Sequence, residues 1–345
     1  MNIIVQKYGG TSVESKENLE IICNKIIDYT KKGTKLVVVV SAQGHTTDNL
    51  LAKAYEYCDN PHKRELDLLL MTGELQTVAL ITMMLKQKGA NAVGLTGEQA
   101  GIITDSTYGN ATIESIYIEN ILNYLNDDMI VVVAGFQGID KFGNITTLGR
   151  GGSDLTAVAL ASALKAKRCE IYTDVDGIFS ADPKIIKKSK LLKKISYDEM
   201  LEAATSGAKV LHNRSVNVGK QNNIQIAVQN FKADNLGSIV DNFKYDIVNN
   251  IETAKVKFIT QNDNVSKISI IGDMLITNKE IINKVFNIAY TENINIYMAS
   301  FSELSINIVV DKSKSNKLVT LLHKNLIDYI DDNKIKSNES DNTNS

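Results

Sequence analysis

The stretch from Thr146 to Leu164, TTLGRGGSDLTAVALASAL, constrains the fold more than any other part of the sequence. Its second half is apolar on nearly every side, and a helix of that kind has to be buried. Its first half is rich in glycine, which lacks the Cβ atom that would keep a ligand away from the backbone. The pattern predicts a helix that starts near Ser153, with Ser153 or Asp154 as N-cap and with free N–H groups that suit an anion.

Short apolar strands alternate with amphipathic helices on both sides of this stretch. The expected strands are Asn2–Gln6, Lys35–Val40, Asn91–Leu95, Met129–Ala134, Cys169–Tyr172 and Ile224–Val228. The expected helices are one with Leu19, Ile22, Cys23 and Ile26 on one face, Glu65–Lys88 with an interruption around Gly73-Glu74, one near Ile113–Leu125, Tyr197–Ala204, and one that starts in Gly207–His212. This alternation predicts an α/β protein whose ligand loops follow the carboxyl ends of parallel strands.

Length, charge and cysteine spacing narrow the class of protein. A chain of 345 residues favours two domains over one. The formal net charge of -2, with no basic cluster interleaved with aromatic residues, argues against a nucleic-acid partner. Cys23, Cys58 and Cys169 stand far apart and indicate reduced core residues rather than a disulfide framework or a zinc site. The apolar runs are of strand length and no signal peptide is evident, so we expect a cytoplasmic protein without a membrane span.

The pattern changes after residue 230. Residues 231–265 are polar and rich in Asn and Asp, which suits a boundary. Beyond them come a strand at Ser266–Ile271, an amphipathic helix, strands at Ile294–Ala299 and Leu304–Val310, and a second helix. This βαββα order predicts a small second domain. Residues 331–345 have too few apolar residues to build a core, and we expect them to be disordered.

Lys7 begins a second glycine loop after the first expected strand. It precedes Gly9 and Gly10, and a fixed ammonium beside bare backbone N–H groups suits the terminal phosphates of a nucleotide. For an isolated motif of this kind, a strand-end lysine in solvent is the alternative. Both standard nucleotide fingerprints fail, because GxxxxGK[ST] is absent and Asp154 stands where GxGxxG has its last glycine. A phosphate site here has to be of another kind.

Six motifs together resemble the ordered motif set of the aspartokinases. They are KYGGTSV (7–13), SAQGHTTDNLL (41–51), GE (73–74), TLGRGGSD (147–154), TDVDGIFSADP (173–183) and GAKVLH (207–212). The resemblance implies the amino-acid kinase fold, an α/β fold in which a three-layer α/β/α sandwich is followed by a smaller C-terminal α+β ACT-like domain. It implies a catalytic domain at 1–240, a linker and remnant strand at 241–265, a single ACT-like regulatory domain at 266–330 and the tail at 331–345.

The resemblance also assigns roles to individual residues. On the nucleotide side it implies Lys7 at the transferring phosphoryl group, Lys209 as a second phosphate-side lysine, and contacts from Tyr8, Gly9, Gly10, Ser41, Thr173, Asp174, Phe179, Asp182 and Lys184. On the substrate side it implies Glu74 for an α-ammonium, Arg150 for a carboxylate, and contacts from Thr46 or Thr47, Gly151, Gly152 and Ser153. Asp154 would orient the lysines, so the implied catalytic set is Lys7, Asp154 and Lys209. The alternative for Glu74 is a solvated charge on a helix.

Three positions depart from the family pattern. Phe179 stands where many relatives have Tyr, Lys184 replaces Arg after Asp-Pro, and Asn213 follows KVLH where Pro is common. The first change loses a hydroxyl but keeps a stacking ring, and the second weakens a bidentate phosphate contact. None removes a group that the implied reaction requires.

The implied reaction is ATP-dependent phosphorylation of the side-chain carboxylate of L-aspartate to 4-phospho-L-aspartate, the first step towards lysine or diaminopimelate, threonine and methionine. A carboxylate is already nucleophilic at neutral pH, so catalysis needs positioning and charge neutralisation rather than a general base. Mg²⁺ is expected to be carried mainly by the ATP phosphates, with no metal site of the protein's own. Two alternatives stay open: the same fold acting on glutamate, carbamate or a nucleoside monophosphate, and a non-catalytic amino-acid sensor.

The C-terminal region departs most from the family. Aspartokinases usually carry two ACT units, but only about residues 266–328 form a complete βαββα unit here, and Ala254–Gln261 resembles the opening strand of a missing unit. Relatives have Pro-Gly before the first helix of the unit, where this chain has Thr277-Asn278-Lys279. Asn278 can cap that helix, but a backbone site for an effector carboxylate is less favoured.

One face of the small sheet bears on assembly. It carries Ile268, Ile270, Ile306 and Ile308 and needs cover, for which a partner chain is the simplest source. We therefore expect a homodimer joined at least partly through residues 266–328, with weak or absent inhibition by lysine or threonine.

Overall fold

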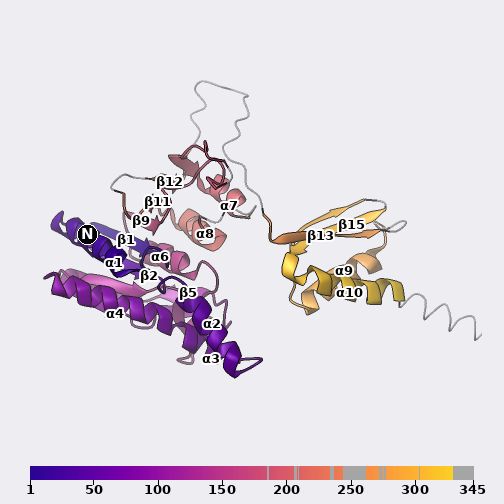
Figure 1. The fold of residues 1–345 in the computed structure, drawn as a ribbon, viewed down its shortest axis with the longest axis horizontal. Coiled ribbons are helices and arrows are strands. Elements are labelled where there is room, and N and C mark those ends of the chain that lie inside the picture. The colour runs from indigo at the N-terminus through magenta and orange to yellow at the C-terminus, as the bar shows by residue number, and fades with distance from the viewer. Residues whose placement is uncertain are drawn as a thin grey trace, which may run out of the picture. The chain divides into compact units, whose positions relative to one another are not determined.

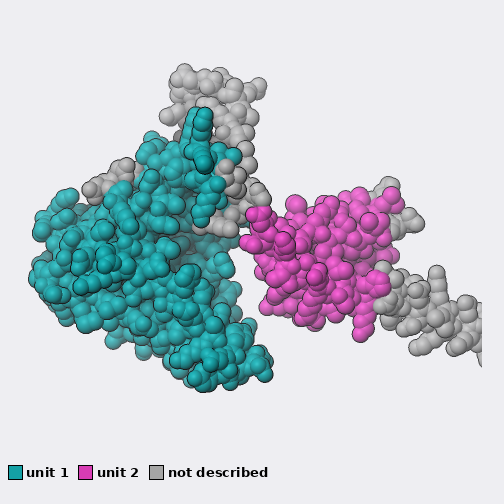
Figure 2. All heavy atoms as spheres, viewed as in Figure 1, with its two compact units in different colours: residues 1–261 teal, residues 262–345 magenta. Residues whose placement is uncertain are grey.

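An eight-stranded sheet organises residues 1–261, the first of two compact units (Figures 1 and 2). The strand order is β10-β12-β11-β9-β1-β2-β6-β3. The strands are β1 (Ile3–Tyr8), β2 (Lys35–Val40), β3 (Ala92–Leu95), β6 (Ile130–Ala134), β9 (Arg168–Thr173), β10 (Lys194–Ser196), β11 (Ile226–Asn230) and β12 (Ser238–Asp241). Among these described strands every pairing is parallel except that of β11 with β12. The continuously apolar run in β2 lies inside the sheet, as its composition predicts.

The described residues leave several gaps. The computed structural model describes residues 1–184, 186–205, 208, 210–233, 237–243, 262–271, 275, 277–302 and 304–328. The expected remnant strand at Ala254–Gln261, the tail at 331–345 and the phosphate-side Lys209 lie outside the described residues.

Helices cover both faces of the large sheet (Figure 1). One face packs against α1 (Lys16–Lys31) and α4 (Thr72–Gln87), and the other packs against α5 (Glu119–Asn126), α6 (Gly152–Ala163), α7 (Tyr197–Thr205) and α8 (Asn213–Asn222). Two further helices, α2 (Thr46–Tyr57) and α3 (Lys63–Leu70), precede α4 in the chain. Val38 of β2 shares a core with Ile81 of α4, and the next residue, Val39, shares the opposite core with Leu160 of α6. The three-layer α/β/α sandwich is therefore confirmed.

A second, four-stranded sheet of this unit was not predicted. Its order is β5-β4-β7-β8, from β4 (Ile102–Thr104), β5 (Ile113–Ile116), β7 (Gln137–Asp140) and β8 (Ile145–Thr147). The expectation of a helix near Ile113–Leu125 is half wrong, because the helix α5 starts only at Glu119. Ile113 and Ile116 have helical i, i+3 spacing, but pairing with β4 holds them in a strand.

Helix starts also differ from the sequence prediction. Gly151, at φ 73, is the N-cap of α6, so Ser153 and Asp154 lie in the first turn and do not cap it. Only glycine reaches this left-handed backbone conformation without cost, and that requirement overrides the preference for a polar N-cap. α8 starts at Asn213, with His212 as N-cap, rather than within Gly207–His212. The predicted burial of α6 is confirmed, since its first ten residues are all buried.

One helical stretch is long and apolar enough, by length and composition, to cross a membrane. It runs over Lys63–Gln87, comprises α3 and α4, and half of its most apolar window is buried inside the protein. Val78, Ile81 and Leu85 of α4 pack against the large sheet. These are properties of a core helix, so the stretch is only weak support for a membrane span.

Residues 262–345 form the second unit, whose described part is a three-stranded antiparallel sheet with helices. Its elements are β13 (Val265–Ile271), α9 (Lys279–Thr291), β14 (Ile296–Phe301), β15 (Ser305–Asp311), α10 (Lys312–His323) and the π-helix η1 (Lys324–Asp328). They follow the expected βαββα order. Asn278 caps α9 as expected, because its Oδ1 accepts the backbone N–H groups of Glu280 and Ile281 at 3.1 Å.

The isoleucine face of this small sheet is covered by the unit's own helices. Ile268, Ile306 and Ile308 are buried, and Ile270 packs against the same core, which includes residues of α9 and α10. The expectation that a partner chain has to cover this face is therefore wrong. The alternation of side chains identified a buried face, but it could not say that the two amphipathic helices of the same unit cover it.

Candidate functional site

The carboxyl ends of four neighbouring parallel strands bring the predicted loops together. β1 pairs with β2 on one side and with β9 on the other, and β2 pairs with β6. The N-terminus of α6 lies at this edge, because a Cβ on Gly135, directly after β6, would lie 2.8 Å from Ser153 Oγ. Open α/β sheets bind ligands at such an edge, and a helix N-terminus there favours an anion.

Lys7 and Asp154 form the centre of the site. Lys7 lies inside β1 rather than after it, because β1 extends to Tyr8. Ile3 and Val5 of β1 face the α6 layer, and strand alternation places Lys7 on the same side. Its Nζ lies 2.7 Å from Asp154 Oδ1, and only 12% and 13% of the two side chains are exposed. This ion pair holds the Lys7 ammonium at the N-terminus of α6.

The glycines after β1 allow close backbone contacts around this ammonium. A Cβ on Gly9 would lie 3.3 Å from Lys7 Nζ, and one on Gly10 would lie 2.9 Å from the carbonyl oxygen of Ala42. The N–H of Gly44 donates to the Gly10 carbonyl at 3.0 Å. The loops after β1 and β2 therefore pack directly on each other, and any side chain at Gly10 would separate them.

Glu74 is buried instead of being a solvated helix charge. It lies in the first turn of α4 and is 3% exposed. The N–H of Ala42 donates to Glu74 Oε1 at 3.2 Å, whereas Oε2 is buried with no hydrogen-bond partner among the described residues. Burial raises the pKa of Glu74 to about 7. An unpartnered buried carboxylate oxygen is costly, and a ligand cation would relieve that cost.

Two threonines and a serine follow β2 beside Glu74. The Thr46 hydroxyl donates to the Gln43 carbonyl at 2.7 Å, and a Cβ on Gly73 would lie 3.4 Å from Thr46 Cγ2, so this side chain packs against the start of α4. Thr47 is half-buried in the next position of α2, and the choice between the two stays open. Ser41 is half-buried directly after β2, where its N–H donates to the Tyr8 carbonyl at 3.1 Å.

Tyr8 does not present its ring to this site. The side chain is fully buried on the α1 face of the sheet, where it stacks on Tyr172 with ring centroids 4.7 Å apart. Because successive strand residues face opposite sides, Tyr8 and Lys7 lie in different layers. The Tyr8 ring therefore packs in the core, and the nucleotide contact that the resemblance implies for this residue stays a prediction that could involve only its backbone.

The loop between β8 and α6 is shaped by positive backbone angles. Gly149 has φ 76 and Gly151 has φ 73. Gly152 N donates to the Gly149 carbonyl at 2.9 Å, which closes a tight turn around Arg150. The Arg150 side chain is exposed and makes no hydrogen bond or ion pair with another described residue. Its guanidinium is therefore available to a ligand, while its backbone is fixed.

Two aromatic residues that the sequence reasoning did not select also touch this loop. A Cβ on Gly151 would lie 2.5 Å from His212 Cβ, and one on Gly152 would lie 2.9 Å from Phe136 Cδ2. Burial and the nearby Arg214 lower the pKa of His212, so its imidazole is neutral at physiological pH. Phe136 has φ 70, which is strained for an aromatic residue. The sequence offered one signal for Phe136, its place between the glycines of GFQG after an apolar strand.

The nucleotide-side residues are less concentrated. Thr173 is the last residue of β9, and its hydroxyl donates to Asp174 Oδ1 at 3.0 Å. The carbonyl of the residue before it, Tyr172, accepts the Gly9 N–H at 3.4 Å. Phe179 is half-buried and bridges to Leu191. Asp182 and Lys184 are both exposed, and the Asp182 carboxylate accepts the Lys184 N–H at 2.8 Å. Thr173 and Asp174 therefore adjoin the Lys7 loop, whereas Asp182 and Lys184 form a local turn.

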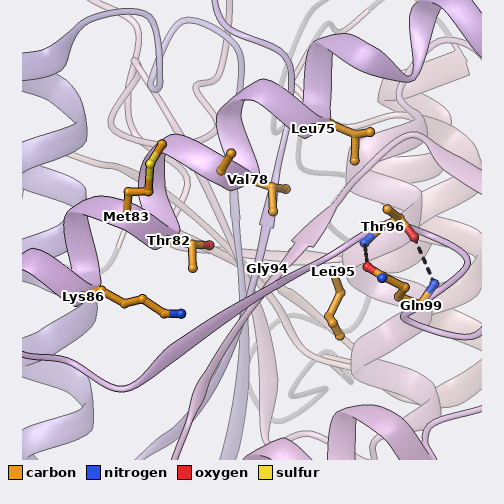
Figure 3. A pocket seen from close by; sticks show the side chains of 10 residues that line it. Leu75, Val78, Thr82, Met83, Lys86, Gly94, Leu95, Thr96 and Gln99 are labelled. Atoms are coloured by element: carbon orange, nitrogen blue, oxygen red, sulfur yellow. Dashed lines mark hydrogen bonds between the residues drawn. The ribbon is translucent and has the colours of Figure 1, made fainter.

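A groove of about 330 Å³ lies away from this site, between α4 and β3 (Figure 3). Its lining is mostly apolar and includes Leu75, Val78, Met83 and Leu95, with Thr96 and Gln99 at one end. The groove contains none of the candidate residues, and Thr96 and Gln99 there hydrogen-bond to each other. Its lining offers no cluster of charged groups for a phosphorylated ligand.

Comparisons with known proteins agree with this geometry. Residues 2–230 match the amino acid kinase family, and residues 268–326 match an ACT domain. An aspartokinase of Bacillus sp. (strain MGA3) is 43% identical over 336 residues, which cover 95% of this chain and 80% of that protein. The chain belongs to the aspartokinase family. An aspartokinase of Geobacillus stearothermophilus is 38% identical, covering 94% of this chain and 97% of that protein.

A solved structure shows the same fold. E. coli aspartokinase III in complex with aspartate and ADP superposes with a TM-score of 0.78 at 24% identity, covering 93% of this chain and 83% of that one. The alignment with the Geobacillus stearothermophilus relative spans 394 residues, although this chain has only 345. Part of that relative therefore has no counterpart here.

Proposed function

We propose that the chain transfers the γ-phosphoryl group of ATP to the side-chain carboxylate of L-aspartate, giving 4-phospho-L-aspartate and ADP. The observation that carries this proposal is the buried Glu74 carboxylate, whose unpartnered Oε2 lies at the edge of the sheet that holds the Lys7–Asp154 pair. A buried carboxylate suits the α-ammonium of an amino acid, and the exposed Arg150 guanidinium suits its α-carboxylate. Membership of the aspartokinase family supports aspartate as that amino acid.

The chemistry needs no general base. The attacking oxygen of aspartate is ionised at neutral pH, so it can displace ADP from the γ-phosphorus by in-line attack as the bridging P–O bond breaks. Lys7, held by Asp154, would neutralise charge on the transferring phosphoryl group, and the first-turn N–H groups of α6 would add to this. Lys209 is proposed as a second cation at the phosphates, although it lies outside the described residues.

Mg²⁺ is proposed to enter with ATP, bound mainly to the phosphates. The donor set near the site fits this mode, because the Asp154 carboxylate pairs with Lys7 and the exposed Asp174 carboxylate accepts the Thr173 hydroxyl, so neither belongs to a closed cage of ligands. Among the described residues no three His, Cys, Asp or Glu side chains gather as a metal site. When bound, the ion would supply further charge neutralisation at the phosphates.

ADP release tests the proposal directly. Release is measured with Mg²⁺-ATP and L-aspartate, with L-glutamate in its place, and with no acceptor. We expect release only with aspartate, and the acyl phosphate product to be trapped by hydroxylamine. Release with glutamate alone would indicate a relative with another acceptor, and no acceptor-dependent release at all would favour an amino-acid sensor.

We infer a cytoplasmic homodimer joined at least partly through residues 266–328. The isoleucine face cannot support this, because it is already covered. The support comes instead from exposed apolar side chains on β13 and β14, namely Ile271, Met298 and Phe301. Sedimentation at micromolar concentration tests the dimer, and a monomer there would refute it.

Inhibition by lysine or threonine is proposed to be weak or absent. The side chain of Asn278 already accepts the first N–H groups of α9, which would otherwise be available to an effector carboxylate. The missing counterpart to part of the Geobacillus relative agrees with a shortened regulatory region. Activity at millimolar lysine, threonine and both together tests this, and strong inhibition by either would contradict it.

A further inference from the structure

Arg214, at the start of α8, binds the backbone of two separate loops. Its Nη1 donates to the Leu148 carbonyl at 2.6 Å and to Asn110 Oδ1 at 3.3 Å, and its Nη2 donates to the Ala111 carbonyl at 2.7 Å. The guanidinium is half-buried, and its pKa is lowered by that burial. Arg214 therefore connects the loop at 109–111 to Leu148, two positions before Arg150.

Asp67 of α3 binds the same two loops with the opposite charge. Its side chain is almost fully buried. Oδ2 accepts the N–H groups of Gly109 at 2.9 Å and Thr147 at 2.8 Å, and Oδ1 accepts the Thr147 hydroxyl at 2.7 Å. Consecutive residues, Thr147 and Leu148, are thus held by a carboxylate and by a guanidinium. Charged groups make stronger and more directional hydrogen bonds than neutral ones.

These anchors determine where Arg150 lies. The next residue, Gly149, packs closely on the same loop, because a Cβ added there would lie 3.0 Å from Asn110 Oδ1 and from the Gly109 carbonyl oxygen. Arg150 itself has no side-chain partner among the described residues, so its position depends on the backbone that precedes and follows it. A shift of the anchored backbone would move its guanidinium by a similar distance.

A purely structural role is the competing explanation. Under that explanation Arg214 would only stabilise the fold. Apolar packing could also hold a loop, and it would avoid the cost of burying an ionised group, a cost that becomes large when the partner of that group is lost. Here the three hydrogen bonds of the guanidinium all go to the two loops beside the candidate site. Arg214 also follows His212, whose side chain limits Gly151 on the other side of Arg150.

We propose that Arg214 is a positioning residue that holds the Arg150 guanidinium where the substrate carboxylate binds. The inference rests on the proposed function for the identity of that substrate. It does not make Arg214 a catalytic residue, since its contacts are to Leu148, Asn110 and Ala111 rather than to a ligand.

Steady-state kinetics with a matched control test this role. Arg214→Met removes the charged fork and keeps the stem, Arg214→Lys keeps a cation that reaches fewer acceptors, and Lys220→Met removes an exposed cation from the same helix, paired with Asp198. A small displacement of a binding group costs on the order of tenfold to a hundredfold. We expect Arg214→Met to raise the KM for aspartate by about that factor and to change the KM for ATP by less than about twofold. Arg214→Lys should lie between wild type and Arg214→Met, and Lys220→Met should match wild type.

A double-mutant cycle separates positioning from general destabilisation. If Arg214 acts through Arg150, then adding Arg214→Met to Arg150→Met should raise the KM for aspartate little further. Additive effects, or equal rises in the KM for both substrates, would overturn the proposal.

Hydrogen exchange gives a readout that does not depend on activity. We expect Arg214→Met to speed amide exchange in residues 109–111 and 147–152 and to leave α1 unchanged, whereas Lys220→Met should change neither. Unaltered exchange at 147–152 would refute the positioning role even in an active enzyme. If wild type releases no ADP with aspartate, the proposed function fails, and exchange alone then decides whether Arg214 fixes this loop.

Discussion

Replacing Glu74 with Gln should increase the stability of the ligand-free protein relative to wild type, and this gain should grow as the pH rises. Burial raises the pKa of Glu74 from 4.5 to about 7 in the folded protein, and the unfolded chain keeps the ordinary value. The folded state therefore binds this proton more tightly, and the stability that it contributes is fully present below pH 4.5 and is lost as the pH rises through about 7. Such a difference in pKa corresponds to about 3 kcal/mol of unfolding free energy.

Glutamine cannot ionise, so the variant does not pay this cost at high pH. Its amide oxygen can keep the hydrogen bond from Ala42, while its NH₂ group would occupy the place of the unpartnered oxygen at any pH. Only the pH dependence is therefore diagnostic. Relative to wild type, the free energy of unfolding of Glu74→Gln should increase by about 2 to 3 kcal/mol between pH 5 and pH 8.

Urea unfolding at four pH values between 5 and 8 measures this difference, with Glu56→Gln as the control. Glu56 is exposed on α2, and its replacement should give a difference that does not change with pH. In the same preparations the KM for aspartate should rise strongly for Glu74→Gln, because the carboxylate that receives the ammonium is gone. A stability difference independent of pH would refute the burial argument, and an unchanged KM for aspartate would refute the substrate role.

Three further substitutions test the rest of the site. Lys7→Ala should lower kcat by about a hundredfold or more in a folded protein, because a cation at the transferring phosphoryl group is lost; near-normal turnover would refute the assignment. Arg150→Lys should raise the KM for aspartate by about tenfold, since a point charge replaces a bidentate fork, and a change confined to the KM for ATP would reverse the two half-sites. Gly151→Ala should lower the free energy of unfolding by about 2 kcal/mol or more, because it combines φ 73 with a 2.5 Å approach to His212. Gly33→Ala, at φ 76 with open space around it, should cost only about 1 kcal/mol and serves as its control in thermal unfolding.

Much of the fold could be predicted because its strands are short, apolar and bounded by glycine loops. Lys35–Val40 was located to the residue, and the buried face of α1 was read from the spacing of Leu19, Ile22, Cys23 and Ile26. The four-stranded sheet was missed because its strands are only three or four residues long and carry little periodic signal.

Within the site, residues in motifs could be found and residues that act through distant contacts could not. Lys7 and Asp154 stand in glycine-rich sequences, and their pairing is a contact between the candidates. Asp67 and Arg214 are 80 and 66 residues away from the backbone groups that they bind, and nothing in their local sequence reports such contacts. The motif also could not place the Tyr8 ring, since a motif gives neighbours in the chain whereas successive strand residues send their side chains to opposite layers.

The place of Lys7 within β1 also determines how the protein would lose activity. Lys7 belongs to a strand paired on both sides, to Val39 of β2 and to Ile171 of β9. Strands of this kind exchange their amide hydrogens only when the whole unit opens, whereas exposed loops open locally at much lower cost. A shift of β1 by one residue would turn the ammonium into the apolar layer beneath α1, so partly slipped states are strongly disfavoured. The Lys7 ammonium should therefore keep its position until the whole unit unfolds. Thermal inactivation should then coincide with the loss of the fold rather than precede it.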